Sequence, residues 1–253
     1  MNLFPDVFRS KNLPLFFISD VHLRLTDSEE ERAKRKTLIQ FIEHVASNQG
    51  TLFIVGDFFD FWFEYKYVIP KAYFDIISAL HHVKSNGAEI YFIKGNHDYW
   101  VKDFIHDTLF TRVCPDSLTL ESNGKTFFIT HGDGLLSWDK GYRLLRKIIR
   151  NPFIMLIFRW IHPDLGYTFA RWISKHSRHP IHTDEYNESV LAELKTFAEK
   201  KWEQGIDYVI SGHYHQAKSI KKEDNTLIIL GDWVTHRSFG YYDGEEFSLN
   251  YWR

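Results

Sequence analysis

Six short apolar runs, each about the length of one buried strand, most restrict how this chain can fold. They lie at 15–18, 52–55, 90–93, 126–129, 208–210 and 227–230. Segments with helical periodicity, such as 31–47 and 71–85, separate the early runs. Strands that alternate with helices predict an α/β fold built in layers. Near the end, 238–242 and 247–252 flank a YDGEE turn and predict an antiparallel hairpin.

Each of the first five runs ends in a short polar motif. The motifs are ISDVHL, VGDFFDFW, KGNHDYW, THGDG and SGHYHQ, and they contain Asp20, His22, Asp57, Asn96, His131, His213 and His215. Ligands of open α/β sheets bind at the carboxyl ends of the strands, so we expect these seven side chains to converge. Glycines at 56, 95, 132 and 212 permit a sharp exit from each strand and a close backbone approach.

The chemistry of these seven side chains predicts a pair of divalent metal ions. Imidazole nitrogens with carboxylate and amide oxygens, and no thiolate, suit Mn, Fe, Zn or Co. Seven ligands exceed the needs of one ion but fit two ions about 3.5 to 4 Å apart that share a carboxylate. Asp57 is the expected shared ligand because it lies between the two groups in chain order. One such motif alone is more often a structural turn, but five, each after its own strand, favour the metal site.

The ordered motifs D-x-H, G-D-x-x-(D/E), G-N-H-(D/E), H and G-H-x-H resemble those of the calcineurin-type metallophosphoesterase superfamily, over roughly residues 13–240. The resemblance implies a four-layer α/β/β/α sandwich of two mixed sheets. It implies one metal held by Asp20, His22, Asp57 and His215, and a second held by Asp57, Asn96, His131 and His213. It also implies that His97, held by Asp98, stabilises developing charge or protonates the leaving oxygen while activated water attacks phosphorus.

Four local features resemble one group within that superfamily, the diphosphatases that cleave UDP-2,3-diacylglucosamine in lipid A biosynthesis. They are GDFFDFW, HGDGLLSWDKGYRLLRKIIRN, the insert that follows, and LGDWVTHRS. This likeness implies an acylated nucleotide-sugar substrate and two divalent ions, with Mn²⁺ expected and Fe²⁺ or Zn²⁺ as alternatives. The expected substrate contacts are Asn96, His97, Asp139, Tyr142, Arg143 and His213.

The chain departs from that group at two places. The group has arginine where this chain has His97. It also has threonine between the paired histidines and Arg-Pro after them, where this chain has Tyr214, Gln216 and Ala217. Histidine is the ordinary superfamily residue at position 97, so hydrolysis itself is still expected.

The segment 138–180 interrupts the alternation of strands and helices. It contains nine Lys or Arg against two acidic residues, interleaved with aromatic and aliphatic side chains, and predicts two or three basic amphipathic helices. A solvated helical hairpin is one reading. The other is a cap, because the insert starts seven residues after His131. Its apolar faces would then hold acyl chains, and its cations would meet diphosphate or anionic headgroups. Those cations are Arg143, Arg146, Lys147 and Arg150.

Charge and cysteine content restrict the possible binding partners and the cellular compartment. A net charge of −2 gives no chain-wide reason to bind nucleic acid. The single Cys114 excludes an internal disulfide, and no signal-peptide pattern opens the chain. We expect one domain over 1–253, a monomer in the cytoplasm that attaches to the inner membrane surface through the insert. The alternatives are a metallophosphoesterase for a soluble phosphodiester or phosphomonoester, and a non-catalytic scaffold.

Overall fold

Two six-stranded mixed sheets form the centre of the computed structural model, which describes residues 7–10, 12–177 and 183–253. The first sheet has the strand order β1-β6-β7-β8-β10-β9 and the second β12-β11-β2-β3-β4-β5. The first comprises β1 (Val7–Arg9), β6 (Ser117–Ser122), β7 (Lys125–Thr130), β8 (Tyr208–Ser211), β10 (Asn225–Ile229) and β9 (Lys218–Lys222). The second comprises β12 (Phe247–Tyr251), β11 (Ser238–Tyr242), β2 (Leu15–Ile18), β3 (Thr51–Val55), β4 (Ile90–Ile93) and β5 (Arg112–Cys114). All six apolar runs and the terminal hairpin are therefore strands, as predicted.

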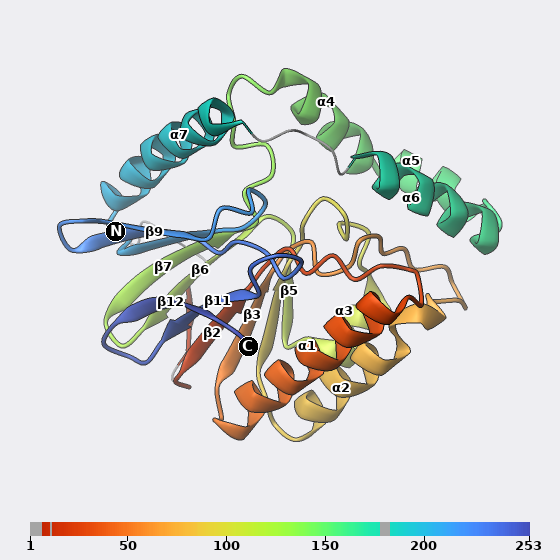
Figure 1. The fold of residues 1–253 in the computed structure, drawn as a ribbon, viewed down its shortest axis with the longest axis horizontal. Helices are drawn as coiled ribbons and strands as arrows, with labels where there is room; N and C mark the ends of the chain where they lie inside the picture. Colours follow the sequence, from red (N-terminus) through yellow and green to blue (C-terminus); the bar gives the residue numbers. More distant parts are fainter. Residues whose placement is uncertain (1–6, 11, 178–182) are drawn as a thin grey trace.

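Helices cover the outer faces of the two packed sheets (Figure 1). The described helices are α1 (Glu29–Ser47), η1 (Lys71–Tyr73), α2 (Phe74–Ser85), α3 (Asp103–Leu109), α4 (Lys140–Ile149), α5 (Pro152–Arg159), α6 (Pro163–Ser177) and α7 (Asp184–Trp202). Helices α1 and α2 cover the second sheet, and α7 covers the first. The predicted four-layer α/β/β/α sandwich is confirmed.

The alternation of side chains along each central strand explains why the strands are apolar throughout. In β3, Leu52 and Ile54 pack under α1 and α2, whereas Phe53 and Val55 face the other sheet. Successive residues of a strand point to opposite faces, so a strand covered on both sides needs apolar residues at every position. The layer between the sheets includes stacked aromatic rings, such as Phe17 on Phe53 with centroids 4.9 Å apart. This packing holds the carboxyl ends of both sheets at one edge.

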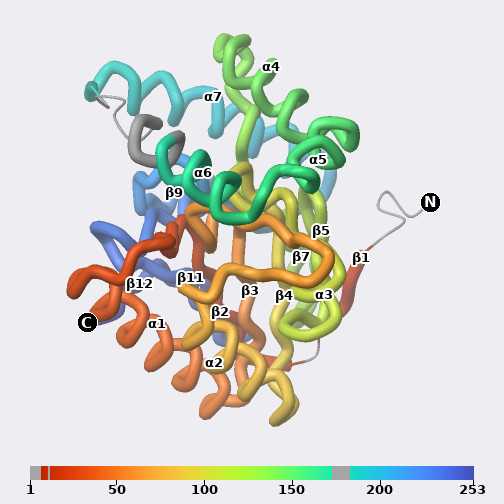
Figure 2. The backbone as a smooth tube through the Cα atoms, turned by 90° about the vertical axis from the view of Figure 1, so that its right-hand side faces the viewer, coloured from red at the N-terminus to blue at the C-terminus, as the bar shows by residue number. Residues whose placement is uncertain are grey.

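The insert lies across that edge of the sandwich as α4, α5 and α6 (Figures 1 and 2). Residues 178–180 of the expected insert lie outside the described residues. Asp139 caps α4 by accepting a hydrogen bond from Tyr142 N, and Asn151 caps α5 with Pro152 in its first turn. The segment therefore forms three helices, where two or three were predicted.

Aromatic contacts and ion pairs fasten the insert to the core. The Phe158 ring lies 4.7 Å from the ring of Phe63 and 5.0 Å from that of Trp100, measured between centroids. Trp100 Nε1 donates to the carbonyl of Ile149 at 2.7 Å. Arg146 Nε donates to Asp133 Oδ2 at 2.6 Å, and Arg150 pairs with both Asp116 and Asp133. Two of the four cations expected to meet substrate or headgroups are therefore engaged within the protein.

Phe158→Ala should loosen the insert while the sandwich stays folded. Phe158 is buried against core aromatic rings, and removal of such a ring costs about 3–5 kcal/mol. We expect faster amide hydrogen exchange and protease cleavage within α4–α6, measured by mass spectrometry. Phe153→Ala removes the same ring from an exposed position on the same helix and is the matched control. Equal protection in both variants would contradict this account of how the insert docks.

Candidate metal centre

The seven side chains predicted as metal ligands follow strands of both sheets. Asp20 and His22 follow β2, Asp57 follows β3, and Asn96 follows β4, all in the second sheet. From the first sheet, His131 follows β7, and His213 and His215 follow β8. The site therefore lies where the carboxyl ends of the two sheets meet, as expected for ligand sites of α/β folds.

One group of candidate ligands consists of Asp20, His22 and His215. Asp20 Oδ2 accepts hydrogen bonds from Ser19 Oγ and from the backbone N–H of His213. Its Oδ1 atom is buried, accepts no hydrogen bond among the described residues, and lies 3.3 Å from His215 Nε2 and 3.7 Å from His22 Nε2. A buried carboxylate oxygen left without a donor is costly. Together with two imidazole nitrogens, it fits a divalent cation.

The second group consists of Asp57, His131 and His213, with Asn96 beside it. Asp57 Oδ2 lies 3.3 Å from His131 Nε2, and Asn96 Oδ1 lies 3.3 Å from the same nitrogen. The other oxygen, Asp57 Oδ1, accepts a hydrogen bond from the backbone N–H of His97. Asp57 Oδ2 is also 4.0 Å from His22 Nε2, which belongs to the first group. Asp57 thus lies between the two groups, the position required of a shared ligand.

Five of the seven candidate ligands have backbone φ angles in the left-handed region. The φ angles of Asp20, His22, Asp57, His213 and His215 lie between +47° and +70°. Non-glycine residues rarely adopt this conformation, and such residues cluster at functional sites. The turns after three different strands are therefore shaped to bring these side chains together.

Electrostatics keep the two carboxylates and His213 in forms that bind metal, whereas the facing carboxylates raise the pKa values of His131 and His215, so these two imidazoles bind an ion only by giving up a proton. Burial raises the pKa of Asp20 and of Asp57, but the nearby His215 and His131 imidazoles hold both pKa values below their usual range. Burial lowers the pKa of His213 to about 4, so this imidazole stays neutral and keeps a lone pair. Ionised carboxylates beside a neutral imidazole form a donor set ready for a cation.

Two carboxylates that lie behind these histidines were not singled out as site residues from the sequence. Asp232 Oδ2 lies 3.6 Å from His215 Nδ1, and Asp60 Oδ1 lies 3.9 Å from His22 Nδ1. A carboxylate behind a histidine fixes the ring orientation and raises its basicity toward metal. The sequence does contain a signal for Asp232, because the pair Gly231-Asp232 follows the sixth apolar run just as Gly56-Asp57 follows the second.

The expectation that Asp98 holds His97 is wrong. Asp98 accepts hydrogen bonds from the backbone N–H groups of Gly95, Phe58 and Phe59. Burial and the charge of Asp57 raise the pKa of Asp98 to about 7. His97 Nδ1 instead contacts the carbonyl of Asp60 at 2.8 Å. Asp98 points toward the backbone of two loops rather than toward its neighbour's ring, because those N–H groups need an acceptor.

The remaining predicted substrate contacts lie on or before α4. The ring of Tyr142 lies 5.3 Å from that of His213, and its buried hydroxyl makes no hydrogen bond with the described residues. Asp139 caps α4 through its Oδ1 atom, and Arg143 is exposed on that helix. Of these three residues, Tyr142 is the one in ring contact with a candidate metal ligand.

The chain is similar in sequence to a known family and to several named proteins. The family model described as calcineurin-like phosphoesterase matches residues 13–217. A UDP-2,3-diacylglucosamine hydrolase of Porphyromonas gingivalis is 28% identical over 91% of this chain and 94% of its own length. A protein of the same name from Neisseria meningitidis is 29% identical over 87% of this chain and 90% of its own. The solved structure of an archaeal phosphodiesterase superposes with a TM-score of 0.49 and 16% identity, over 94% of this chain and 99% of that one.

Gly95→Ala should release metal from the site. A methyl group at this position would lie 2.1 Å from Asp57 Oδ1 and 2.4 Å from Asp57 N, so the candidate shared ligand would have to move. We expect a clear fall in bound metal per chain, measured by mass spectrometry of the purified protein. Gly141→Ala is the control, because a methyl group there meets only Asp139 Oδ1, at 3.9 Å. Undiminished metal content in Gly95→Ala would show that the ions do not depend on Asp57 as placed.

Proposed function

This chain belongs to the calcineurin-like phosphoesterase family, and we propose that it is a two-metal hydrolase that cleaves the diphosphate of UDP-2,3-diacylglucosamine. The products are UMP and 2,3-diacylglucosamine 1-phosphate, a step of lipid A biosynthesis. The observation that carries the proposal is the pair of ligand groups on either side of Asp57. The relatives named UDP-2,3-diacylglucosamine hydrolase, which align over most of the chain, support this choice of substrate.

Each proposed metal has four protein ligands. Asp20, His22, Asp57 and His215 hold one ion, and Asp57, Asn96, His131 and His213 hold the other. The ions, proposed to be Mn²⁺, would supply positive charge near the transferring phosphoryl group and would lower the pKa of a water that serves as the nucleophile. Asp232 and Asp60 lie behind His215 and His22 and keep their rings directed at the site.

His97 is the proposed donor to the leaving group. Hydrolysis joins the oxygen of water to one phosphorus and breaks the bond from that phosphorus to the bridging oxygen, which departs on the other phosphate. The departing oxygen needs a proton or a hydrogen bond. His97 Nδ1–H donates to the Asp60 carbonyl, so Nε2, 3.9 Å from Asp57 Oδ2, carries a proton to donate only in the imidazolium form. The nearby Asp57 and Asp60 outweigh burial and raise the pKa of His97, which favours that form. The free Tyr142 hydroxyl beside His213 is the proposed second donor to the phosphates.

The insert is proposed to act as a cap for the acyl chains and as the contact with the membrane. Most of the exposed large hydrophobic side chains of the described residues lie between Trp138 and Trp172. Trp160 is 85% exposed, and Leu165 and Phe153 are each 65% exposed. Exposed apolar surface beside exposed cations such as Arg143 suits an anionic lipid surface.

Among the described helices, none combines the length and apolar character needed to cross a bilayer. In this proposal the whole chain is one cytoplasmic domain that works as a monomer at the inner membrane surface.

Release of UMP from UDP-2,3-diacylglucosamine is the direct test. We expect the purified protein with Mn²⁺ to hydrolyse this substrate and to leave UDP-N-acetylglucosamine, which lacks the acyl chains, nearly untouched. Product UMP is measured by chromatography beside turnover of bis-p-nitrophenyl phosphate. Turnover of the aryl diester alone would keep the metal centre but replace the substrate with a soluble phosphodiester. No turnover of any of the three with added Mn²⁺ would instead favour a scaffold.

His97→Ala should lower turnover by roughly 10² to 10⁴, the usual contribution of a proton donor. Bound metal should stay unchanged, because His97 is not a proposed ligand. Turnover and metal content are measured on the same preparation, with the exposed His81→Ala as the control. Loss of metal in His97→Ala would show that the residue is a ligand rather than a donor.

Trp160→Glu should weaken binding to lipid vesicles by about tenfold or more, because it replaces exposed apolar surface with a negative charge. Binding is measured by co-sedimentation with vesicles of phosphatidylglycerol and phosphatidylethanolamine. Tyr67→Glu is the matched control, since Tyr67 is also 85% exposed but lies outside the insert. Equal loss in the two variants would mean that charge alone, and not the insert, determines attachment.

A further inference from the structure

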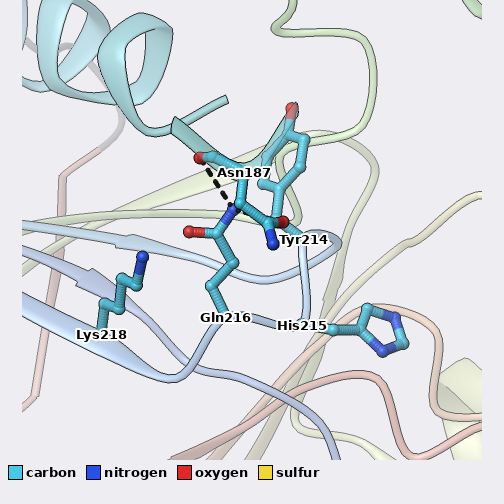
Figure 3. Close-up of a pocket in the computed structure, with 5 residues that line it drawn as sticks. All are labelled: Asn187, Tyr214, His215, Gln216 and Lys218. Carbon is cyan, nitrogen blue, oxygen red and sulfur yellow. Dashed lines mark hydrogen bonds between the residues drawn. The ribbon is translucent and has the colours of Figure 1, made fainter. Parts of the chain in front are cut away.

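We infer that a pocket beside His215 binds the uracil base of the nucleotide half of the substrate, an inference that rests on the proposed function. Asn187, Tyr214, His215, Gln216 and Lys218 line this pocket. Figure 3 shows Gln216 and Asn187 facing one another, with Lys218 beside them and the His215 ring turned away from the other four. The pocket thus shares one residue with the metal centre, the candidate ligand His215.

The position of the pocket follows from the direction in which the substrate must lie. The insert meets the His213 side of the centre, where the Tyr142 ring contacts the ring of His213. The pocket is lined by His215 and by Asn187 in the first turn of α7. Helices α5 and α6 extend away from the start of α7 on the other side (Figure 1). A diphosphate over the metals with its acyl chains toward the insert must direct its nucleoside toward the opposite wall. That wall is this pocket.

The amide of Gln216 provides an acceptor of fixed direction. Gln216 Nε2 donates to the backbone carbonyl of Asn187 at 3.3 Å and lies 3.4 Å from Asn187 Oδ1. A carbonyl can only accept, so this contact decides which end of the amide is nitrogen. Gln216 Oε1 then has no hydrogen-bond donor among the described residues, although it is buried. An imide N–H, such as N3–H of uracil, would satisfy it.

A second polar group matches the same edge of the base. Asn187 Oδ1 is directed at Gln216, so the Asn187 Nδ2 donors remain for an acceptor such as O4 of uracil. Cytosine reverses both positions, with an acceptor at N3 and a donor at N4. The pair of amides should therefore distinguish uracil from cytosine.

Size and charge agree with a nucleobase rather than a larger group. The pocket measures about 250 Å³, below the ~300–1,000 Å³ that encloses a whole drug-sized ligand. Its five lining residues include no carboxylate, and Lys218 adds positive charge. A neutral base attached to an anionic phosphate is compatible with that lining, whereas a cationic group is not.

Binding of UMP and CMP to the Mn²⁺-loaded full chain tests the inference by calorimetry. We expect UMP to bind at least about fivefold more tightly than CMP, since CMP leaves buried amide groups unpaired. Gln216→Leu should bring the UMP to CMP affinity ratio close to one, because it removes the acceptor. Partial unfolding of the variant would weaken binding of UMP and CMP alike and leave their affinity ratio unchanged. Binding of inorganic phosphate, which has no base, is measured separately to test whether the metal centre is intact.

A lysine pair on β9 gives the matched control. Lys218→Ala should weaken UMP binding more than Lys221→Ala, because both remove one exposed positive charge from the same strand but only Lys218 lines the pocket.

Equal affinity for UMP and CMP, or a preference that survives Gln216→Leu, would overturn the inference. Hydrolysis of UDP-2,3-diacylglucosamine by the unchanged chain is assayed in parallel. Its absence with a retained UMP preference would refute the proposed substrate and not the pocket.

Discussion

The buried carboxylate of Asp57 is the group on which the rest of the site depends. An isolated charge in a protein interior costs several kcal/mol, so it persists only where donors and positive charge surround it. Here one oxygen accepts the backbone N–H of His97, and the other faces His131 and His22. The packed sheets hold these partners at fixed positions, because each follows a strand buried in the sandwich. The glycines at the strand ends allow the backbone to approach closely enough for this arrangement.

The central strands and the convergence of the seven candidate ligands could be predicted from the sequence. Both depend on local patterns, an apolar run covered on two faces and a polar turn at its end. Strands β1, β5, β6 and β9 escaped prediction. For example, β9 is the largely exposed KSIKK, and β6, which lies beside the edge strand β1, alternates as SLTLES. Helix α7 was also missed, although its buried Val190, Leu194 and Ala198 recur every four residues, as expected for one face of a helix. The missed strands lack a continuous apolar run.

The role of Asp98 shows a different limit. Adjacency in sequence suggested that it holds His97, but neighbouring side chains in a turn point in different directions. The nearest unpaired partners for its carboxylate were three backbone N–H groups, two of them from the loop after β3. Contacts between loops depend on the relative placement of two strands, which no local pattern encodes. The same reason explains why Asp232, 17 residues after His215, was not connected with it in advance.

The segment between β7 and β8 carries residues proposed for substrate binding and is flanked by candidate metal ligands. The insert and α7 both lie between β7, which His131 follows, and β8, which leads to His213 and His215. The proposed contacts for both halves of the substrate thus come mainly from this connection and the turn after β8, while the turns after β2, β3 and β4 supply candidate ligands and the proposed donor His97. Arg146 and Arg150 tie α4 to Asp133, two residues beyond His131. Movement of the insert would therefore be transmitted to the candidate ligand at one end of the connection, so that the cap and the metal centre cannot be repositioned independently.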